Sequence, residues 1–438
     1  MKGPLLPVSE TEQALRGSAT FDILGSPHAA LVQRRTIAVL VITQIIGTIG
    51  VGVAPTIGVL LAGDVTHNEA WAGLARTAST LGAALFGLPL GNLAARFGRR
   101  FALSSGWCIA AVGSGILVAA AQGSMVVPLF VGLLLIGAGS AVSLQARFAA
   151  TDLALPLHKG RSLALIVWVG TVGSVLGPNL GVPGEVISRQ TGLTVYASAF
   201  LIAALCLGLA GVIVFLSLRP DPLLVLKQAV PAQASAPRRR AGRIRRILAE
   251  LRVNRPARLA VVAILTAQVV MASVMTMTPV HIADEGGSIT IVGLTISLHV
   301  AGMYALSPLV GFLADRYGPK LTMSAGVLIF LASLVAGALR PDDMGWIMGS
   351  LILLGVGWSF VSVAGAALFS RVVSDEARAS SQGGVDALSN LCAAVGAFLA
   401  GPLLAATNFS VLSILAMVVL IPLSVLILGR ERVPVAVD

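Results

Sequence analysis

Long runs of apolar residues without any charge dominate the chain. Clear examples are residues 36–62, 101–121 and 259–283, none of which contains Asp, Glu, Lys or Arg. An α-helix needs about 20 residues to cross about 30 Å of hydrocarbon, and each run reaches that length. Inside lipid, every backbone N–H and C=O group must find its partner within the protein, so these runs predict membrane-spanning helices.

The alternation of apolar runs with short polar segments predicts twelve such helices. In the first half of the chain the expected spans are residues 36–61, 71–92, 101–121, 125–147, 162–184 and 194–218. In the second half they are residues 259–282, 289–311, 320–339, 346–369, 384–406 and 409–428. The predicted fold class is all-α integral membrane, with twelve helices arranged as two six-helix bundles.

The same pattern divides the chain into two bundles, a linker and two tails. Their expected bounds are a cytoplasmic tail of residues 1–33, a bundle of residues 34–218, a basic cytoplasmic linker of residues 219–258, a bundle of residues 259–430 and a cytoplasmic tail of residues 431–438. Of the 438 residues, 56% are hydrophobic and only 11% are charged. Soluble proteins carry about 25% charged residues, so this composition excludes them.

The net charge of +11 comes largely from the linker. Between Arg219 and Arg258 lie eleven Lys and Arg residues, opposed only by Asp221 and Glu250. Basic residues beside membrane spans mark cytoplasmic loops, so we expect a multi-pass protein of the cytoplasmic (inner) membrane with both termini in the cytoplasm. The linker contains no aromatic residue for base stacking, which argues against a nucleic-acid partner.

Two similar turns lie 220 residues apart, each expected between the second and third spans of its half. The first reads GNLAARFGRR from Gly91 and the second reads GFLADRYGPK from Gly311. Both resemble the Gly-x-Leu-Ala-Asp-Arg-x-Gly-Arg-Arg signature of the major facilitator superfamily. The resemblance implies two six-helix halves with a substrate site between them, and the turns are expected to gate it. The gating candidates are Gly91, Arg96, Gly98, Arg99, Arg100, Gly311, Asp315, Arg316, Gly318 and Lys320.

The fifth span is similar to the antiporter-type helix motif of that family. Its helix-packing residues are Gly173, Gly177, Pro178 and Gly181. Glycines in membrane helices also allow close packing, which explains most of them without any further role. Two positions depart from the family's patterns: Ala95 stands where the first turn would have aspartate, and Leu133 stands where proton-coupled drug exporters carry arginine. These departures disfavour a drug/proton antiporter.

One histidine and three methionines are the candidate substrate or metal ligands. They are Met271, Met275, His299 and Met303. No span has a carboxylate near its middle, and ionisable groups inside the membrane are costly, which makes His299 informative. Each helix offers an i, i+4 pair on one face, and Met271 and His299 are expected at nearly the same depth. Soft thioether and imidazole ligands suit Cu(I), although methionine also fills gaps in apolar cores.

This pairing of Met-x-x-x-Met with His-x-x-x-Met resembles the CcoA-like branch of the superfamily. The stretch from Met275 to His281 and the segment of residues 292–318 are similar to that branch as well. The resemblance implies copper import across the cytoplasmic membrane. Riboflavin importers of the same branch share the motifs, so the motifs alone leave copper and riboflavin open.

Other polar residues of the spans are further candidates. Three amides either contact the substrate or hold helices together: Gln44, Gln268 and Asn390. Arg76, about a turn inside the second span, either extends to the membrane interface or meets the substrate. Arg147 and Asp152, near the inner end of the fourth span, are expected to form cytoplasmic gate contacts.

The resulting prediction is a secondary transporter that works by alternating access and imports a small substrate, with copper favoured. Alternatives are an importer of riboflavin or another small organic solute, a multidrug-type efflux transporter, and a transporter-like membrane sensor. An enzyme is disfavoured, because no nucleophile–base pair or paired carboxylates lie at membrane depth. We expect a monomer in the lipid bilayer with no permanently bound cofactor, copper being a transported substrate only.

Overall fold

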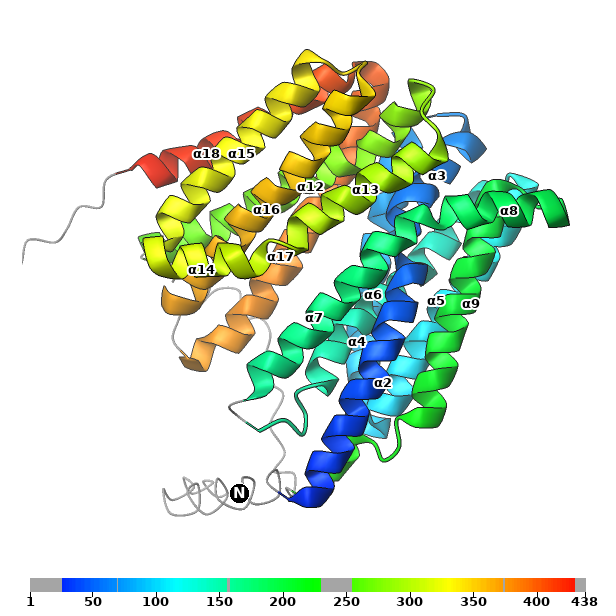
Figure 1. The fold of residues 1–438 in the computed structure, drawn as a ribbon, viewed down its shortest axis with the longest axis vertical. Coiled ribbons are helices and arrows are strands. Elements are labelled where there is room, and N and C mark those ends of the chain that lie inside the picture. The colour runs from blue at the N-terminus through cyan, green and yellow to red at the C-terminus, as the bar shows by residue number, and fades with distance from the viewer. Residues whose placement is uncertain (1–25, 69, 156–157, 230–253, 373–374, 430–438) are drawn as a thin grey trace, which may run out of the picture.

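The computed structural model describes residues 26–68, 70–155, 158–229, 254–372 and 375–429 (Figure 1). This part of the chain is built of helices joined by short turns, and it contains no strand. Twelve of its helical segments are long and apolar enough to cross a membrane. The predicted all-α membrane fold with twelve spans is confirmed.

The first half places six spans in sequence, two of them interrupted. Its elements are α2 (Pro27–Gly52), η1 (Ala54–Gly58), α3 (Val59–Thr66), α4 (Ala70–Phe97), α5 (Arg99–Gly123), α6 (Val126–Ala149), α7 (Lys159–Leu176), η3 (Gly177–Leu180), α8 (Gly181–Thr191) and α9 (Val195–Ser217), followed by the short helix α10 (Pro222–Ala229).

The second half repeats the plan with one interrupted span. Its elements are α12 (Arg255–Asp284), α13 (Ile289–Tyr304), α14 (Ser307–Tyr317), α15 (Pro319–Leu339), α16 (Met344–Val372), α17 (Asp375–Ala406) and α18 (Phe409–Leu428). The predicted bounds of the bundles and linker remain predictions. Both ends of the chain and the arginine-rich stretch of residues 238–246 lie outside the described residues.

Three spans that the sequence predicts as continuous are broken at prolines. Pro55 lies in the π-helical turn η1, Pro178 lies in the 3₁₀ turn η3, and Pro308 follows the break between α13 and α14. Proline lacks a backbone N–H and its ring clashes with the preceding turn, so the helix changes pitch there. The first two breaks lie against each other, because a Cβ on Gly177 would lie 2.7 Å from the Cα atom of Gly52.

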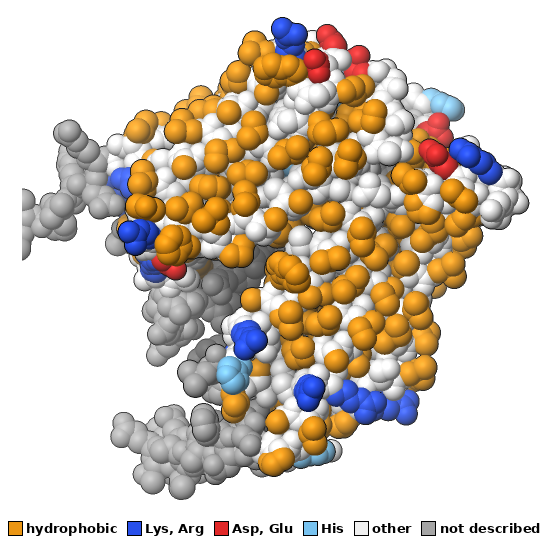
Figure 2. Space-filling model, in the orientation of Figure 1, with side chains coloured by type: hydrophobic (Ala, Val, Ile, Leu, Met, Phe, Trp, Pro, Cys, Tyr) orange, Lys and Arg blue, Asp and Glu red, His pale blue; other side chains and the backbone are white. Residues whose placement is uncertain are grey.

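Each half encloses its own apolar core. In the first half, Trp107 and Phe200 are completely buried, and in the second half Phe330 and Phe409 are. The outer surface is also apolar, as Figure 2 shows by the hydrophobic side chains spread over both bundles. Aliphatic side chains exposed to solvent in such density fit contact with lipid rather than water.

We call the end of the molecule that carries Gly98 and Gly318 the turn end, because α4 meets α5 there and α14 meets α15. Described basic residues of this end include Arg96, Arg99, Arg100, Lys159, Arg161, Lys227, Arg316, Lys320 and Arg371. Segments of the opposite end carry six acidic residues, Asp64, Glu185, Asp284, Glu285, Asp342 and Asp343, and only the basic residues Arg189 and Arg340 beside them. The two ends therefore differ in charge.

Two seams carry most of the contacts between the halves in the described part of the chain, and α12 adds further contacts with α3 and α4. In one seam α4 crosses α17 where Gly73 and Gly401 leave no room for a side chain, and Thr77 Oγ1 donates to Ala394 O at 3.0 Å. The seam lies near the start of α4 and the end of α17, which is the opposite end of the molecule.

The second seam joins η3 to α13. Ser297 Oγ accepts a hydrogen bond from Asn179 Nδ2 at 2.6 Å and donates one to Val175 O at 2.6 Å. In Figure 1 the halves lie close beside α3, α8 and α13 and diverge toward α14 and the start of α7. Figure 2 shows the surface hollowed between the diverging parts. The described seams thus hold the halves together toward the opposite end.

Candidate functional site

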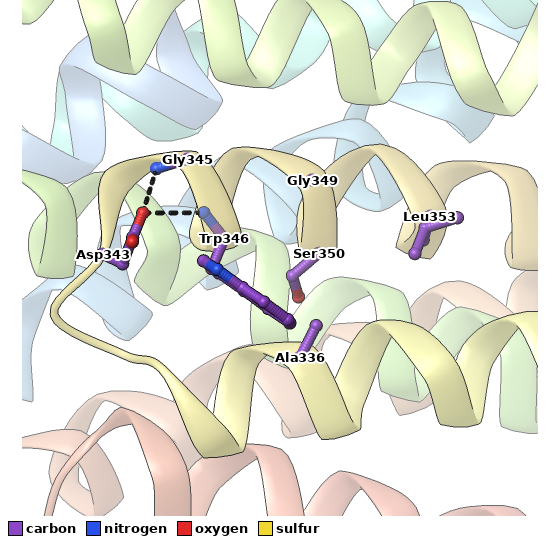
Figure 3. Close-up of a pocket in the computed structure, with 7 residues that line it drawn as sticks. All are labelled: Ala336, Asp343, Gly345, Trp346, Gly349, Ser350 and Leu353. Atoms are coloured by element: carbon purple, nitrogen blue, oxygen red, sulfur yellow. Dashed lines mark hydrogen bonds between the residues drawn. The ribbon is translucent and has the colours of Figure 1, made fainter.

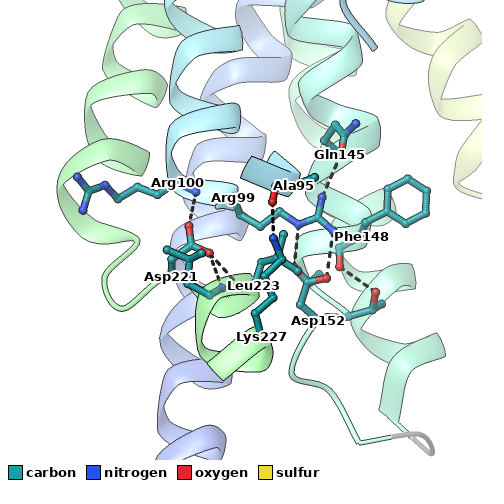
Figure 4. A network of polar contacts seen from close by, with 12 residues as sticks. Ala95, Arg99, Arg100, Gln145, Phe148, Asp152, Asp221, Leu223 and Lys227 are labelled. Carbon is teal, nitrogen blue, oxygen red and sulfur yellow. Dashed lines mark hydrogen bonds and ion pairs between the residues drawn. The ribbon is translucent and has the colours of Figure 1, made fainter. Parts of the chain in front are cut away.

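The first signature turn is held by a buried ion pair (Figure 4). Arg99 Nε donates to Asp152 Oδ2 at 2.8 Å, and Arg99 Nη2 donates to Asp152 Oδ1 at 3.1 Å. Arg99 Nη1 also donates to Gln145 Oε1 at 3.1 Å, and Gln145 Nε2 donates to Gly87 O at 3.3 Å. The side chains of Arg99 and Asp152 are only 12% and 10% exposed. One guanidinium therefore ties α5 to α4 and to the end of α6.

Asp152 follows α6 at the turn end. Burial raises the pKa of its carboxyl group, and the hydrogen bonds from Arg99 oppose that rise. Its partner is a residue of the signature turn rather than a neighbour on its own helix. A bidentate arginine–carboxylate pair has a fixed geometry, so it holds the turn in one orientation.

Asp221, the first acidic residue of the linker, caps two helices at once. Gly98 has φ +93° and lies against the Asp221 carboxylate, which leaves no room for a Cβ atom. Asp221 Oδ2 accepts from Arg100 N at 2.7 Å, while Oδ1 accepts from Leu223 N and Leu224 N at 3.0 and 3.2 Å. The carboxylate satisfies backbone donors at the N-termini of α5 and α10, where the helix dipoles favour negative charge.

The short helix α10 also reaches the place where the first turn lacks its aspartate. Lys227 Nζ donates to the backbone O of Ala95 near the end of α4 (Figure 4). A cation at a helix C-terminus is favourable because carbonyl groups there have no partner in the helix. In this half, Asp221 and Lys227 of the linker both contact the signature turn. The ten residues of the turn give no sign of these contacts.

The second signature turn is held differently. Asp315 Oδ1 accepts from Arg371 Nη2 at 2.7 Å, and these side chains are 75% and 46% exposed. Gly318 has φ +88°, a conformation that favours glycine, and Arg316 lies 5.8 Å from the ring of Tyr317. The two related turns therefore differ in both charge arrangement and burial.

The other gating candidates have fewer described contacts. A Cβ on Gly91 would lie 3.2 Å from Gln145 Nε2, whereas a Cβ on Gly311 would meet open space. Arg96 lies 5.0 Å from the ring of the following phenylalanine. Lys320 lies in the first turn of α15 and is partly buried.

The three candidate methionines are buried in the apolar core of the second half. Met271, Met275 and Met303 are 4%, 7% and 5% exposed and belong to one hydrophobic cluster. His299 is completely buried, and its Nδ1 lies 2.7 Å from Leu351 O on α16. A carbonyl can only accept, so Nδ1 carries the hydrogen and Nε2 carries a lone pair. That Nε2 is buried and has no hydrogen-bond partner among the described residues.

Within the part of the chain that the structure describes, no three His, Cys, Asp or Glu side chains gather as a metal site. A metal at His299 would therefore depend on the thioether sulfurs. Convergence of the four predicted ligands on one ion remains a prediction.

Two aromatic rings and an amide contact one another in the second half, and no sequence pattern marks them as a unit. The rings of Tyr304 and Trp358 lie edge to face with their centroids 5.7 Å apart. Trp358 Nε1 donates to Gln268 Oε1 at 2.9 Å. These residues come from α13, α16 and α12, and all three are partly exposed. Gln268, a predicted polar contact, thus belongs to a site with two aromatic rings.

Two arginines of the first half lie within or at the ends of spans, and both are partly buried. Arg76 lies near the start of α4, toward the opposite end, whereas Arg147 lies in the last turn of α6, at the turn end. Arg76 could be recognised from the sequence because arginine is rare inside a membrane span. Nothing in the sequence distinguishes Tyr304 and Trp358 from other aromatic residues.

Gln44 and the glycines of the fifth-span motif pack helices. Gln44 is buried on α2 beside Gly170 of α7, and its Oε1 has no hydrogen-bond partner among the described residues. Asn390 is exposed on α17. In the fifth-span motif, Gly173 lies against α2, and a Cβ on Gly181 would lie 2.7 Å from Ile289 of α13.

A groove lies at the opposite end of the second half (Figure 3). It has a volume of about 520 Å³ and is lined by Ala336, Asp343, Gly345, Trp346, Gly349, Ser350 and Leu353. Asp343 Oδ1 accepts from the N–H groups of Gly345 and Trp346 at 2.8 and 3.2 Å. The groove is formed by α15, α16 and the turn between them, so it is not the site between the halves.

The family model described as Major Facilitator Superfamily matches residues 37–291 and again residues 259–437. The chain belongs to the major facilitator superfamily. Its family and relatives are transporters, which confirms that the chain is not an enzyme.

Three relatives extend over nearly the whole chain. The uncharacterized MFS-type transporters YddS and YdeG of Bacillus subtilis are 35% and 36% identical, covering 87% and 91% of this chain and 87% and 93% of their own lengths. The riboflavin transporter RfnT of Brucella anthropi is 29% identical over 90% of this chain and 96% of its own length.

Solved structures with low sequence identity share the fold. A bacterial homolog of the human lysosomal transporter Spinster, in an inward-facing and unoccupied conformation, has a TM-score of 0.67 at 15% identity and covers 92% of this chain and 97% of its own. The nucleoside transporter NupG has a TM-score of 0.67 at 14% identity and covers 91% and 100%. At these identities the likeness shows the fold alone.

Proposed function

We propose that this transporter works by alternating access and imports a small organic solute across the cytoplasmic membrane. The observation that carries the proposal is the group of partly exposed polar and aromatic side chains in the second half, built on Tyr304, Trp358 and Gln268. Transporters of this plan bind substrate between their two halves and move one half against the other.

The described conformation fits one state of such a cycle. The seams at Gly73–Gly401 and Asn179–Ser297 join the halves toward the opposite end, and the halves diverge at the turn end. The basic residues of the turn end favour a cytoplasmic position for it, as the positive-inside rule requires. The site would then open to the cytoplasm, with both termini on that side and the protein acting as a monomer.

Riboflavin is the substrate that the site supports best. A flavin presents a planar aromatic ring system with a polar edge, which matches two aromatic rings and an amide. Stacking on aromatic side chains stabilises bound bases by about 1–3 kcal/mol each, and a glutamine can bond to the edge. A riboflavin transporter among the relatives supports the same choice.

Copper is the second candidate, and one observation favours it. His299 Nε2 has a lone pair and no described hydrogen-bond partner, and Met271, Met275 and Met303 are buried in the core of the same half. An imidazole with thioether sulfurs suits Cu(I). Copper would be transported cargo, and no permanently bound cofactor is part of the proposal.

Replacing Trp358 with alanine tests the organic-solute proposal. The loss of one stacking ring predicts at least a tenfold fall in labelled riboflavin uptake at unchanged abundance in the membrane. The matched control is Trp346→Ala, on the same helix but in the groove of the opposite end, which should leave uptake unchanged. Riboflavin uptake by the Trp358→Ala variant equal to that of the unmodified protein would overturn the proposed site.

A further inference from the structure

Three aromatic rings form a row on the outer surface of the first half, at the turn end. The rings of Phe97 and Phe101 lie edge to face with their centroids 6.4 Å apart, and the rings of Phe101 and Phe215 do so at 5.8 Å. They come from the end of α4, the start of α5 and the end of α9, and all three are exposed. Exposed rings at the ends of membrane spans lie where hydrocarbon gives way to lipid headgroups.

Two arginines lie against one ring of this row. The guanidinium carbon of Arg100 lies 4.9 Å from the centre of the Phe101 ring and 4.7 Å from the centre of the Phe215 ring. The guanidinium carbon of Arg219, which follows α9, lies 5.9 Å from the centre of the same Phe215 ring. A guanidinium group held against two rings has little freedom to turn, so Arg100 has a defined position on the surface.

The guanidinium group of Arg100 lacks a polar partner in the described part of the chain. Its Nε is shielded from solvent and makes no hydrogen bond there. In Figure 4 its side chain extends away from Arg99 and Asp152. The ion pairs of the two signature turns are Arg99–Asp152 and Arg371–Asp315, and neither includes Arg100. Arginine has five N–H donors and no acceptor, so an anion from outside the chain would satisfy it.

The carboxylate that contacts the backbone of Arg100 is already used. Asp221 Oδ2 accepts from Arg100 N, and Asp221 Oδ1 accepts from Leu223 N and Leu224 N. Asp221 itself is buried. Both of its oxygen atoms are thus bound to backbone groups, so the exposed part of the arginine and aromatic cluster is positive.

An apolar stripe on α9 leads to these rings. Leu205, Leu209, Val212 and Leu216 are all exposed, and they follow one another at intervals of four, three and four residues. That spacing places them on one face of the helix, and the stripe ends beside Phe215. A surface that is aliphatic along the span and positive at its end matches a molecule with an acyl chain and an anionic head.

We propose that Arg100 and Arg219 form a binding site for one anionic phospholipid of the leaflet that surrounds the turn end. The phosphate binds the N–H groups of Arg100, and Arg219 adds a second positive charge. An acyl chain lies along Phe215 and the α9 stripe. Arginine binds phosphate oxygens in a bidentate manner, and basic sites at the ends of membrane spans attract anionic lipid. This site is separate from the transported substrate and does not depend on its identity.

Three probes that share a phosphate test the site on the purified full chain in detergent. They are phosphatidylglycerol, phosphatidylethanolamine with the same acyl chains, and sn-glycerol 3-phosphate, and native mass spectrometry measures their binding. We expect phosphatidylglycerol to bind about fivefold more tightly than phosphatidylethanolamine, whose ammonium group meets positive charge. We expect sn-glycerol 3-phosphate at equal concentration to leave bound phosphatidylglycerol in place, because it has no acyl chain.

Substitutions locate the site on the surface. Arg100→Gln and Arg219→Gln should each weaken phosphatidylglycerol binding by about fivefold. The matched control is Arg161→Gln, which removes an exposed positive charge at the same end, on α7. It should leave the affinity unchanged, and an equal loss in this control would show general attraction to charge and overturn the site.

Two further outcomes would overturn the inference, and neither requires a variant to fold. One is equal binding of phosphatidylglycerol and phosphatidylethanolamine to the unmodified protein. The other is displacement of bound phosphatidylglycerol by an equal concentration of sn-glycerol 3-phosphate, because the cluster would then recognise a phosphate without its lipid.

Discussion

Arg99 and Asp152 form a bidentate ion pair that joins the start of α5 to the residues after α6. The related turn of the second half uses Asp315 and Arg371, which form a single hydrogen bond on the surface. The two halves thus share a signature in sequence and differ in how it is stabilised. Neither pair can form in the other half, because alanine at position 95 stands where position 315 has aspartate, and proline at position 319 stands where position 99 has arginine.

The buried pair should matter more for stability than the exposed pair. Asp152→Asn leaves Arg99 without its carboxylate in a shielded position, so we expect the free energy of unfolding to fall by about 3 kcal/mol. Asp315→Asn removes a largely exposed partner and should cost about 0.5 kcal/mol. Denaturant titration in detergent measures both. Equal effects of the two substitutions would show that the burial of Arg99 has no energetic consequence.

The glycine seam predicts a shift in conformation. Gly73→Ala adds a methyl group where the backbone of α17 lies, and overpacking costs about 1–3 kcal/mol, enough to change a two-state population about tenfold. Gln190 and Asp342 lie in different halves at the opposite end, and each can be replaced by cysteine and spin-labelled. In the Gly73→Ala variant, a larger share of molecules should show a long distance between the two labels.

Gly87→Ala is the matched control for this substitution. It lies on the same helix, and a Cβ there would meet no atom within 4 Å. Its distance distribution should equal that of the unmodified protein. If Gly73→Ala also leaves the distribution unchanged, the contact between α4 and α17 does not set the conformation.

The positions of the spans could be predicted from the sequence because hydrocarbon imposes a length on apolar runs. The interruptions at Pro55, Pro178 and Pro308 could not be predicted. A proline in a membrane helix can bend the helix, or neighbouring groups can satisfy the freed backbone carbonyl so that the helix continues. Only the contacts in three dimensions show that η1 and η3 meet at Gly52 and Gly177.

The candidate site was predicted only in part. Gln268 and Arg76 were recognisable as polar groups inside apolar runs. Trp358 and Tyr304 were not, because aromatic residues are common in membrane helices and only their contacts distinguish them. In the sequence, Asp221 is only one of two acidic residues in a basic linker. Its bond to Arg100 spans 121 residues, and no local pattern predicts such a contact.

The charge difference between the two ends predicts the orientation in the membrane. In a variant without native cysteines, Ser235→Cys in the linker should react with a membrane-impermeant thiol reagent only after the cells are opened. Gln190→Cys, exposed at the end of α8, should react in intact cells. Labelling of Ser235→Cys from outside would reverse the proposed orientation.

The methionines distinguish a metal site from core packing. Met271→Leu and Met275→Leu keep volume and apolarity, costing less than about 1.5 kcal/mol each, while they remove the sulfur atoms. If copper is the cargo, the double variant should lose copper uptake at unchanged membrane abundance. If these residues only fill the core, copper accumulation should equal that of the unmodified protein, and the metal site is wrong.

The most direct test of the substrate is uptake of riboflavin and copper, measured side by side in the same cells with and without this protein. We expect labelled riboflavin to accumulate only when the protein is present, with copper accumulation indifferent to it. We also expect Trp358→Ala to reduce the riboflavin signal. Copper accumulation that follows the protein while riboflavin does not would contradict the proposed function.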